Sequence, residues 1–313
     1  MLIASQLEPF FNAALAERLG AEVLPIARGA PHALPGEARV LVAAPLFGVP
    51  DVAHLPHPAA PPQGWPFNLD WIQLVSSGID HYPKWFLEAV PVSTARGVAA
   101  EPIAEFVIGA IFEAVKQLHT VWIHSPEAWR IRPFPPLAGS TIGLVGYGAI
   151  GRAVARKAQG LGLKVHVLRR SPPPEGEPGV VFERTIEDLL AVTDHLVLAA
   201  PGTPQTRHIL NAESLKAVKP GVHVINIARG SLIDDDAFLA AIADGRIGLA
   251  TLDTTTPEPL PAGHPYYTLP QVRVSPHTSA IGIAPRLALV EKVAANLERW
   301  SAGTPLLDAV HAA

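Results

Sequence analysis

The sequence contains no cysteine, which excludes disulfide bonds, thiolate metal sites and cysteine nucleophiles together. It also lacks a strong charge of either sign, because 24 basic and 28 acidic side chains give a net charge of −4. That balance argues against a general binder of nucleic acids or anionic membranes. No apolar run approaches the ~18 residues that span a bilayer, and "MLIASQLEPFFNAALAERLG" lacks the pattern of a signal peptide. These absences favour a soluble, cytoplasmic protein without nucleic-acid or membrane partners.

Proline, by contrast, is abundant, with 33 residues. Prolines cluster at 54–67, 132–137 and 171–179, which we interpret as loops. His54 and His57 lie in the first of these loops with no third ligand nearby, so we expect surface groups and no metal site. The length of 313 residues and the hydrophobic fraction of 49% suffice for two domains.

Apolar segments alternate with amphipathic ones from residue 140 onward. The segments typical of strands are 140–146, 164–170, 195–200, 223–228, 247–253 and 272–276. Helical spacing occurs at 149–162, 185–192, 211–221 and 234–245. This alternation predicts a doubly wound parallel sheet covered by helices on both faces.

The first ~95 residues predict a smaller α/β domain, with strands near 1–6, 21–27, 39–45 and 71–78 and a helix at 10–19. A long helix is expected at 101–119 and an extended, aromatic-containing arm at 121–139. The helix at 285–303 follows the last strand and is expected to return to the small domain. We therefore expect a discontinuous domain of 1–97 and 286–313, and a second domain of 98–285.

The stretch "GLVGYGAIG" places Gly146, Gly148 and Gly151 between a strand and a helix. The first glycine makes a tight turn, the second lets the backbone approach a pyrophosphate, and the third brings helix and strand together. The helix N-terminus stabilises the negative charge of the phosphates. This context predicts a dinucleotide-binding site.

Arg229 follows the strand in "NIARGSLID", and Asp253, Glu258 and His277 lie at or after the next two strands. Two interpretations of Arg229 stay open: a surface ion pair, or a clamp that holds a carboxylate through two hydrogen bonds. His277 is likewise either a structural histidine or a proton donor working near neutral pH.

Taken in order, G-x-G-x-x-G, "INIARG", "LD…TPEPLP…HP" and "VSPHTSA" resemble the D-isomer-specific 2-hydroxyacid dehydrogenase family, of glyoxylate/hydroxypyruvate reductase type. "VSSGID" (75–80), "EPIAE" (101–105) and "NLERWSAGTPLLDAV" add to the likeness, which runs from about residue 70 to the end. "ARGVAA" (95–100) and "PPQGWPF" (61–67) depart from the family pattern. No regulatory domain is expected after the last helix, which argues against a feedback-regulated phosphoglycerate dehydrogenase.

The resemblance implies a Rossmann nucleotide-binding domain and a smaller, flavodoxin-like substrate domain. It implies that Arg229 binds the substrate carboxylate, that His277 exchanges a proton with the substrate oxygen and that Glu258 supports His277. The N–H groups of Ser77 and Gly78 would also bind the carboxylate. The implied cofactor-binding residues are Gly146, Gly148, Ala149, Ile150, Gly151, Arg169, Arg170, Ser171, Pro201, Thr206, Ile227, Ala228, Asp253 and Ser279. Asp253 would lie near the nicotinamide.

The arm containing Trp122, Trp129 and Phe134 resembles the dimer-forming region of the family, so a homodimer is expected, although these aromatics are equally compatible with an ordinary core. Arg169 lies 18 residues after Gly151, where an acidic residue would select NAD. Arg169, Arg170 and Ser171 predict NADP(H) instead, with NAD possible, unless both arginines are only solvated charges.

The predicted function is hydride transfer between NADP(H) and a small 2-keto or D-2-hydroxy acid. Two alternatives stay open: a dinucleotide-sensing corepressor or scaffold on the same fold, and a formate or phosphite dehydrogenase. The presence of Arg229, Glu258 and His277 together favours the enzyme. The sequence does not identify the keto acid.

Overall fold

The computed structural model describes residues 1–28, 34–45, 60–80, 82–172 and 177–310. The chain forms two compact units, each built around its own sheet. We call residues 1–99 with 281–313 the discontinuous unit, and residues 100–280 the continuous unit. The expectations for His54 and His57 lie outside the described residues.

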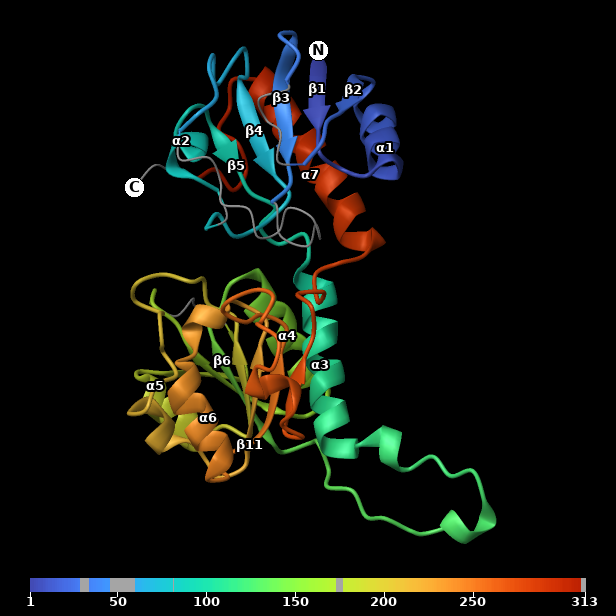
Figure 1. Cartoon of the computed structure of the whole chain (residues 1–313), viewed down its shortest axis with the longest axis vertical. Coiled ribbons are helices and arrows are strands. Elements are labelled where there is room, and N and C mark those ends of the chain that lie inside the picture. The colour runs from blue at the N-terminus through green and yellow to red at the C-terminus, as the bar shows by residue number, and fades with distance from the viewer. Residues whose placement is uncertain (29–33, 46–59, 81, 173–176, 311–313) are drawn as a thin grey trace. The chain divides into compact units, whose positions relative to one another are not determined.

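The discontinuous unit contains a five-stranded parallel sheet in the order β2-β1-β3-β4-β5. Its strands are β1 (Leu2–Ser5), β2 (Glu22–Pro25), β3 (Ala38–Ala43), β4 (Trp71–Leu74) and β5 (Val92–Ser93). Helices α1 (Pro9–Leu19) and α7 (Ile283–Ser301) bury apolar side chains on one face, and α2 (Lys84–Leu87) on the other (Figure 1). This strand order is that of flavodoxin, which confirms the predicted fold class.

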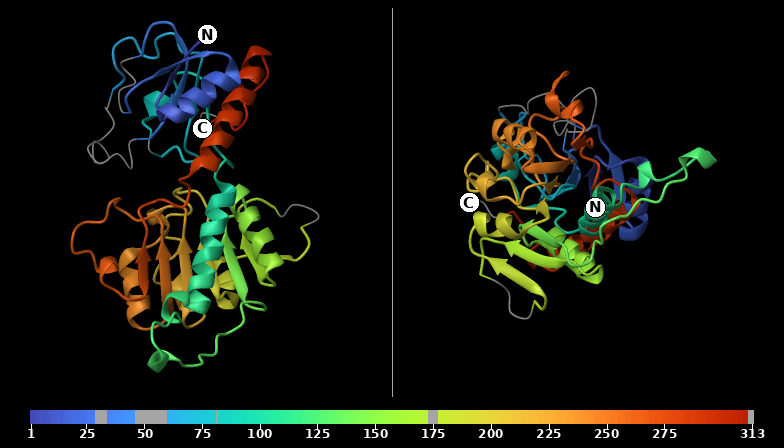
Figure 2. Two further views of the ribbon diagram at one scale, coloured as in Figure 1. Left: turned by 90° about the vertical axis from the view of Figure 1, so that its right-hand side faces the viewer. Right: turned by 90° about the horizontal axis from the view of Figure 1, so that it is seen from below.

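The continuous unit contains a seven-stranded parallel sheet in the order β12-β11-β10-β9-β6-β7-β8. Its strands are β6 (Thr141–Val145), β7 (Lys164–Leu168), β8 (Val180–Glu183), β9 (His195–Leu198), β10 (Val222–Asn226), β11 (Ile247–Leu252) and β12 (Val272–Val274). Its helices are α3 (Ala100–Lys116), α4 (Ala149–Gly160), α5 (Ile186–Val192) and α6 (Asp235–Ala243). Helices α3 and α4 cover one face and α5 and α6 the other (Figure 2), as a doubly wound sheet requires.

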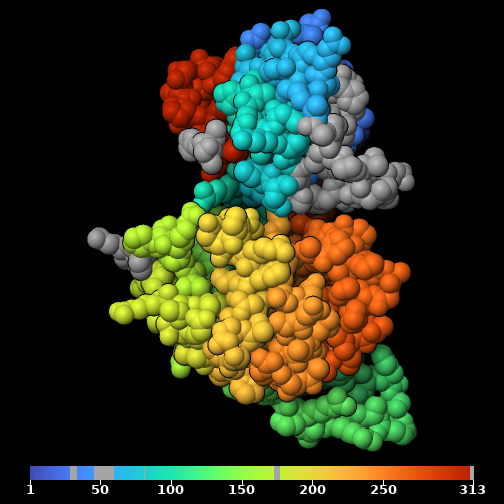
Figure 3. All heavy atoms as spheres, turned by 60° about the vertical axis from the view of Figure 1, so that its left-hand side comes forward, coloured from blue at the N-terminus to red at the C-terminus, as the bar shows by residue number. Residues whose placement is uncertain are grey.

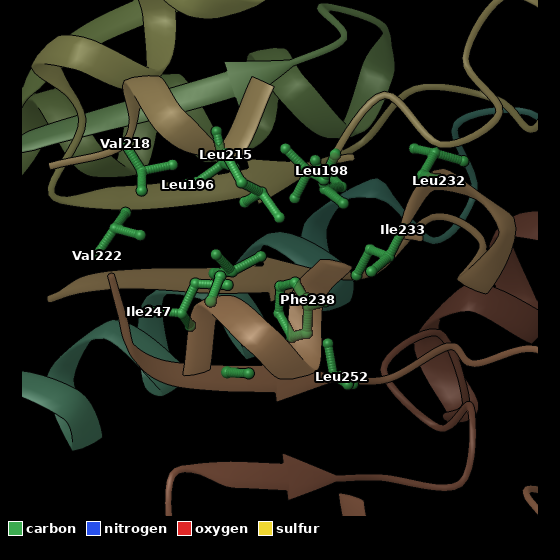
Figure 4. Packing of buried hydrophobic residues seen from close by; sticks show 14 of the residues in the cluster. Leu196, Leu198, Leu215, Val218, Val222, Leu232, Ile233, Phe238, Ile247 and Leu252 are labelled. Atoms are coloured by element: carbon green, nitrogen blue, oxygen red, sulfur yellow. The ribbon is translucent and has the colours of Figure 1, made fainter. Parts of the chain in front are cut away.

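A large apolar core lies between this sheet and α5 and α6 (Figure 4). Phe238 of α6 is completely buried there, against strand residues such as Leu198 and Leu252. Leu215 and Val218 close the same core from the segment before β10. Close packing of this kind gives the strand ends a rigid base.

Three local expectations differ from the structure. The segment 211–221 forms only a short 3₁₀ turn, Ser214–Ala217, instead of a helix. There the Asn211 side chain accepts hydrogen bonds from the amides of Glu213 and Ser214, which competes with helical bonding. Helix α3 ends at Lys116 because Gln117 adopts a left-handed conformation with φ of 44°. Strand β8 was not expected, since a short edge strand carries little pattern.

The segment 121–139 is extended, as predicted, and it leaves the continuous unit at the end of α3 (Figures 1 and 2). A short 3₁₀ turn, Leu118–Thr120, precedes it, and another, Pro126–Ala128, interrupts it. Figure 3 shows its side chains in green at the lower edge of this unit. Within the described residues, no helix is both long enough and apolar enough to cross a membrane.

Candidate active site

Most of the predicted site residues gather at one edge of the seven-stranded sheet. Because all seven strands run parallel, their carboxyl ends meet at that edge. The glycine turn follows β6, Arg229 follows β10, and Asp253 and His277 follow β11 and β12. Ligands of open α/β sheets bind outside the carboxyl ends, beside the point where the strand order reverses. Here that point lies between β6 and β9.

The glycine turn after β6 has the geometry that a pyrophosphate needs. Gly146 has φ of 104°, and a Cβ on it would lie 2.8 Å from the backbone of Ala199 and Ala200. A Cβ on Gly151 would lie 2.4 Å from the Gly146 carbonyl oxygen, so helix α4 approaches the turn closely. At Gly148, which caps α4, a Cβ would meet nothing within 4 Å. The first amides of α4, including those of Ala149 and Ile150, would face a bound phosphate across this open space.

The second strand of the unit brings Arg169 beside that turn. Val145 of β6 pairs with Leu168 of β7, and the Gly146 amide donates to the Leu168 carbonyl at 2.9 Å. Within the described part of the chain, neither Arg169 nor Arg170 forms a side-chain hydrogen bond or ion pair. Ser171 is exposed at the start of the following loop. Arg169 and Arg170 therefore directly follow the strand whose end lies beside the adenine ribose in this fold.

The far leg of that loop is tied to the glycine turn. The Tyr147 hydroxyl donates to Glu177 Oε2 at 2.9 Å, and the Tyr147 ring meets Phe182 edge-on at 5.6 Å. Burial raises the pKa of Tyr147 to about 12, so its hydroxyl stays protonated. Among the described residues of this leg, the acidic Glu177 is thus held by a phenol.

Two further segments of the implied cofactor site have well-defined local structure. After β9, the Thr206 hydroxyl donates to the Pro201 carbonyl at 2.6 Å and closes the turn between them. After β10, Ile227 and Ala228 are buried, and the Ala228 amide donates to Asn226 Oδ1 at 3.1 Å.

Arg229 extends from a backbone that its neighbours hold on both sides. Asn226 Nδ2 donates to the Arg229 carbonyl at 2.8 Å, and Arg229 Nη1 donates to the Ala228 carbonyl at 2.7 Å. A Cβ on Gly230 would lie 2.0 Å from the backbone of Thr255. Only glycine permits this close approach, so the loops after β10 and β11 are in direct backbone contact.

His277 and Glu258 form an ion-pair geometry at the same edge. Their Nδ1 and Oε2 atoms are 2.9 Å apart, and both side chains are only partly exposed. The other oxygen of Glu258 accepts from the Thr255 amide at 3.0 Å. His277 has a left-handed backbone with φ of 50°, and its amide donates to the Ser275 carbonyl. Local backbone contacts thus fix both the ring and the carboxylate.

Asp253 is 1% exposed and is occupied by hydrogen bonds to the loop that carries His277. Its Oδ1 accepts from Ser275 Oγ at 2.6 Å and from the Thr278 amide at 2.9 Å, and its Oδ2 accepts from the Ser279 amide at 3.1 Å. Sequence reasoning missed Ser275 and Thr278 as partners of this carboxylate. Their position directly after a strand and beside His277 was the available signal.

Ser77 and Gly78 lie in the other unit, directly after β4. The Ser76 carbonyl accepts from the Ala95 amide at 3.0 Å, and the Ser77 hydroxyl donates to the Ala95 carbonyl at 3.2 Å. Among the described residues, the amides of Ser77 and Gly78 donate no hydrogen bond. They are therefore suited to an anion.

A second polar cluster, away from the strand ends just described, is buried under α3. His195 Nδ1 lies 3.4 Å from His223 Nδ1, and His223 Nε2 lies 3.0 Å from Thr251 Oγ1. Burial lowers the pKa of His223 to about 3 and also lowers that of His195. Both rings are therefore neutral at physiological pH.

Comparison with known proteins supports this description. Residues 108–279 match the family model of the D-isomer specific 2-hydroxyacid dehydrogenase NAD-binding domain. The chain is 37% identical over 185 residues to a glyoxylate reductase of Thermococcus kodakarensis, covering 58% of this chain and 55% of that protein. It is 32% identical over 251 residues to a glycerate dehydrogenase of Methylorubrum extorquens, covering 76% and 78%.

Among solved structures, a D-isomer specific 2-hydroxyacid dehydrogenase of Xanthobacter autotrophicus Py2, in complex with NADPH and MES, is similar over 99% of this chain and 97% of that chain. The TM-score is 0.78 and the sequence identity 27%. The likeness therefore includes the first ~65 residues, where the sequence motifs give little guidance.

Proposed function

The chain belongs to the D-isomer specific 2-hydroxyacid dehydrogenase family, and we propose that it reduces small 2-keto acids, of the glyoxylate or hydroxypyruvate type, to D-2-hydroxy acids with NADPH. The observation that carries this proposal is the 2.9 Å contact between His277 and Glu258 at the sheet edge that also presents Arg229. A proton donor and a carboxylate binder on one sheet edge are what such a reduction requires.

A bound nicotinamide would supply the hydride for the carbonyl carbon. Its dinucleotide would be held by the amides that follow Gly148, at the start of α4, where the open space fits a pyrophosphate. The protein must then neutralise the negative charge that develops on the substrate oxygen.

His277 would donate a proton to that oxygen during reduction and recover it during oxidation. Because its Nδ1 faces Glu258, the proton would come from Nε2. Glu258 would keep the ring in one orientation, as a carboxylate bonded to the other ring nitrogen does. Asp253 would act indirectly, by holding the backbone of residues 275–279.

Arg229 would bind the substrate carboxylate with two parallel hydrogen bonds, since a planar guanidinium matches that geometry. The amides of Ser77 and Gly78 would bind the same carboxylate. The contact between Gly230 and Thr255 supports a joint role for Arg229 and His277, because Thr255 also donates to Glu258.

A preference for NADPH over NADH is proposed from Arg169 and Arg170, whose guanidiniums would bind a 2′-phosphate through charge-assisted hydrogen bonds. The link from Tyr147 to Glu177 supports this, because it ties an acidic side chain of the returning leg to the glycine turn.

The decisive experiment is a spectrophotometric assay of glyoxylate, hydroxypyruvate, pyruvate and phenylpyruvate with NADPH and with NADH. Turnover of the small keto acids, faster with NADPH, is the expected result. A protein that oxidises formate or phosphite instead, or turns over none of these compounds, would contradict the proposal.

A homodimer held by the arm is proposed as well. Trp122, Trp129 and Ile131 are 68%, 76% and 95% exposed, a concentration of apolar surface that is unusual on a monomer. Light scattering should give twice the 33.2 kDa of one chain, and removal of both tryptophan side chains should shift the mass toward the monomer. A monomeric wild type at micromolar concentration would refute the dimer.

A further inference from the structure

The loop between β7 and β8 is tied to the glycine turn near both of its ends. Where the chain leaves β7, the Gly146 amide donates to the Leu168 carbonyl at 2.9 Å. Where it returns toward β8, the Tyr147 hydroxyl donates to Glu177 Oε2 at 2.9 Å. Residues 169–171, which carry the two arginines, lie in sequence between these two ties. Both ends of the loop are thus referred to the same turn, the one that would face the pyrophosphate.

The Tyr147 side chain is itself held in one place. It is 7% exposed, and its ring meets that of Phe182 in β8 edge-on, with centroids 5.6 Å apart. The Tyr147 carbonyl accepts from Arg152 Nη1 at 3.2 Å, which joins this backbone to helix α4. A buried ring in contact with another ring has little freedom to rotate. The phenol therefore offers its proton to Glu177 from a fixed position.

The residues that follow Glu177 are held against helix α4. Gln159 Nε2 of this helix donates to the Pro178 carbonyl at 2.9 Å. Gly179 has a left-handed backbone with φ of 74°, and a Cβ on it would lie 2.9 Å from Gln159 Nε2. The returning leg, residues 177–179, thus has two side-chain anchors in succession. The anchor from Tyr147 starts from the glycine turn itself.

We propose that Tyr147 is a positioning residue for NADPH, whose hydrogen bond to Glu177 holds the loop so that Arg169 and Arg170 are preorganised for the 2′-phosphate. This rests on the proposed function, because it assumes that these arginines bind that phosphate. A loop that is already ordered loses less conformational entropy on binding. The Tyr147 hydroxyl touches neither phosphate nor substrate in this proposal. Its effect belongs to the affinity for the 2′-phosphate and not to the chemical step.

Tyr147→Phe tests the proposal while keeping the ring. We expect the dissociation constant of adenosine 2′,5′-bisphosphate, measured calorimetrically, to rise roughly three- to tenfold, the range of one lost hydrogen bond. The dissociation constant of 5′-AMP, which has no 2′-phosphate, should stay within about twofold of the wild type. Tyr266→Phe is the matched control in the same unit, because the Tyr266 hydroxyl donates to Asp235 Oδ1 at 2.7 Å and its ring meets Phe238 edge-on. This control should change neither constant.

Substitutions of Glu177 separate positioning from charge. Glu177→Ala should weaken binding of the bisphosphate as Tyr147→Phe does, and the double variant should be little weaker than either, because the two side chains form one hydrogen bond. Glu177→Gln keeps an acceptor oxygen for the phenol and should bind the bisphosphate at least as tightly as the wild type. Unchanged or tighter binding by Glu177→Ala overturns the inference, since the carboxylate would then act by repulsion. An unchanged dissociation constant in Tyr147→Phe overturns it as well.

Activity distinguishes this inference from the proposed function. With glyoxylate as substrate, Tyr147→Phe should raise the KM for NADPH by the same factor as the dissociation constant and leave kcat within about twofold. If the wild type prefers the bisphosphate to 5′-AMP but reduces no keto acid, the proposed reaction fails, while the binding series still decides the role of Tyr147. A wild type that binds both nucleotides equally tightly refutes the NADPH preference and this inference together.

Discussion

The two units contain the same kind of sheet, with parallel strands ending at one edge, yet they equip that edge differently. The continuous unit places side chains there, including Arg229, Glu258 and His277. The discontinuous unit offers main-chain amides after β4, in a loop held by hydrogen bonds of Ser76. Sequence motifs consist of side chains, so the sequence predicts which residues of the continuous unit lie at this edge. Almost any residue can supply an amide, so in the other unit only the family resemblance of "VSSGID" (75–80) indicated this edge.

The comparison predicts that the largest losses follow changes to side chains of the continuous unit. His277→Ala should lower kcat by about 10²–10⁴-fold, because proton transfer from a positioned group contributes that much. The dissociation constant of NADPH should stay nearly unchanged. His124→Ala on the exposed arm is the control and should retain full activity. A kcat of the variant above a tenth of the wild-type value would show that His277 is not the proton donor.

Arg229→Lys keeps the charge and loses the planar pair of donors. We expect kcat/KM for the keto acids to fall about ten- to a hundredfold, the range of hydrogen bonds to charged groups. Arg246 precedes β11, at the end of the strand opposite to the candidate site, and pairs with Asp244 through two hydrogen bonds. Arg246→Lys breaks this comparable pairing and should leave kcat/KM unchanged. Near-normal kcat/KM in Arg229→Lys would mean that no bidentate contact exists.

Arg169→Asp should reverse the cofactor preference by roughly ten- to a hundredfold in the ratio of kcat/KM for NADPH and NADH, because it exchanges attraction of a 2′-phosphate for repulsion. The measurement is the pair of kcat/KM values in wild type and variant. Arg184→Asp, one strand further out after β8, controls for the change in net charge. Equal kcat/KM values for NADPH and NADH in the wild type would mean that Arg169 is only a solvated charge at the end of the strand.

The smallest expected effect concerns stability at acidic pH. The lowered pKa of His223, about 3, means that the unfolded chain binds a proton that the folded chain rejects. The free energy of unfolding is therefore highest above the ordinary histidine pKa of about 6.5 and falls as the pH decreases toward 3, by about 1.4 kcal/mol per pH unit for each such proton.

Urea unfolding at pH 7 and pH 5 measures this fall, and His223→Gln should reduce it. His124→Gln on the exposed arm should leave it unchanged. An identical fall in wild type and His223→Gln would assign the acid sensitivity to other groups.

The degree to which sequence predicted this molecule follows the same division. The family and the α/β class followed from spaced glycines and strand-end motifs. The segment 211–221 was misread because its apolar spacing is helical, whereas the Asn211 side chain takes the amides that a helix would use. The partners of Asp253 were missed because a sequence lists carboxylates without the backbone amides that occupy them.

The backbone contact at Gly230 has a consequence for protein engineering. A library that randomises position 230 would contain almost no functional members, because even alanine would collide with Thr255. Diversity aimed at new keto acids is better placed in the discontinuous unit, whose sequence departs most from the family pattern. The two loops that carry Arg229 and Glu258 should be kept unchanged together in any engineered variant.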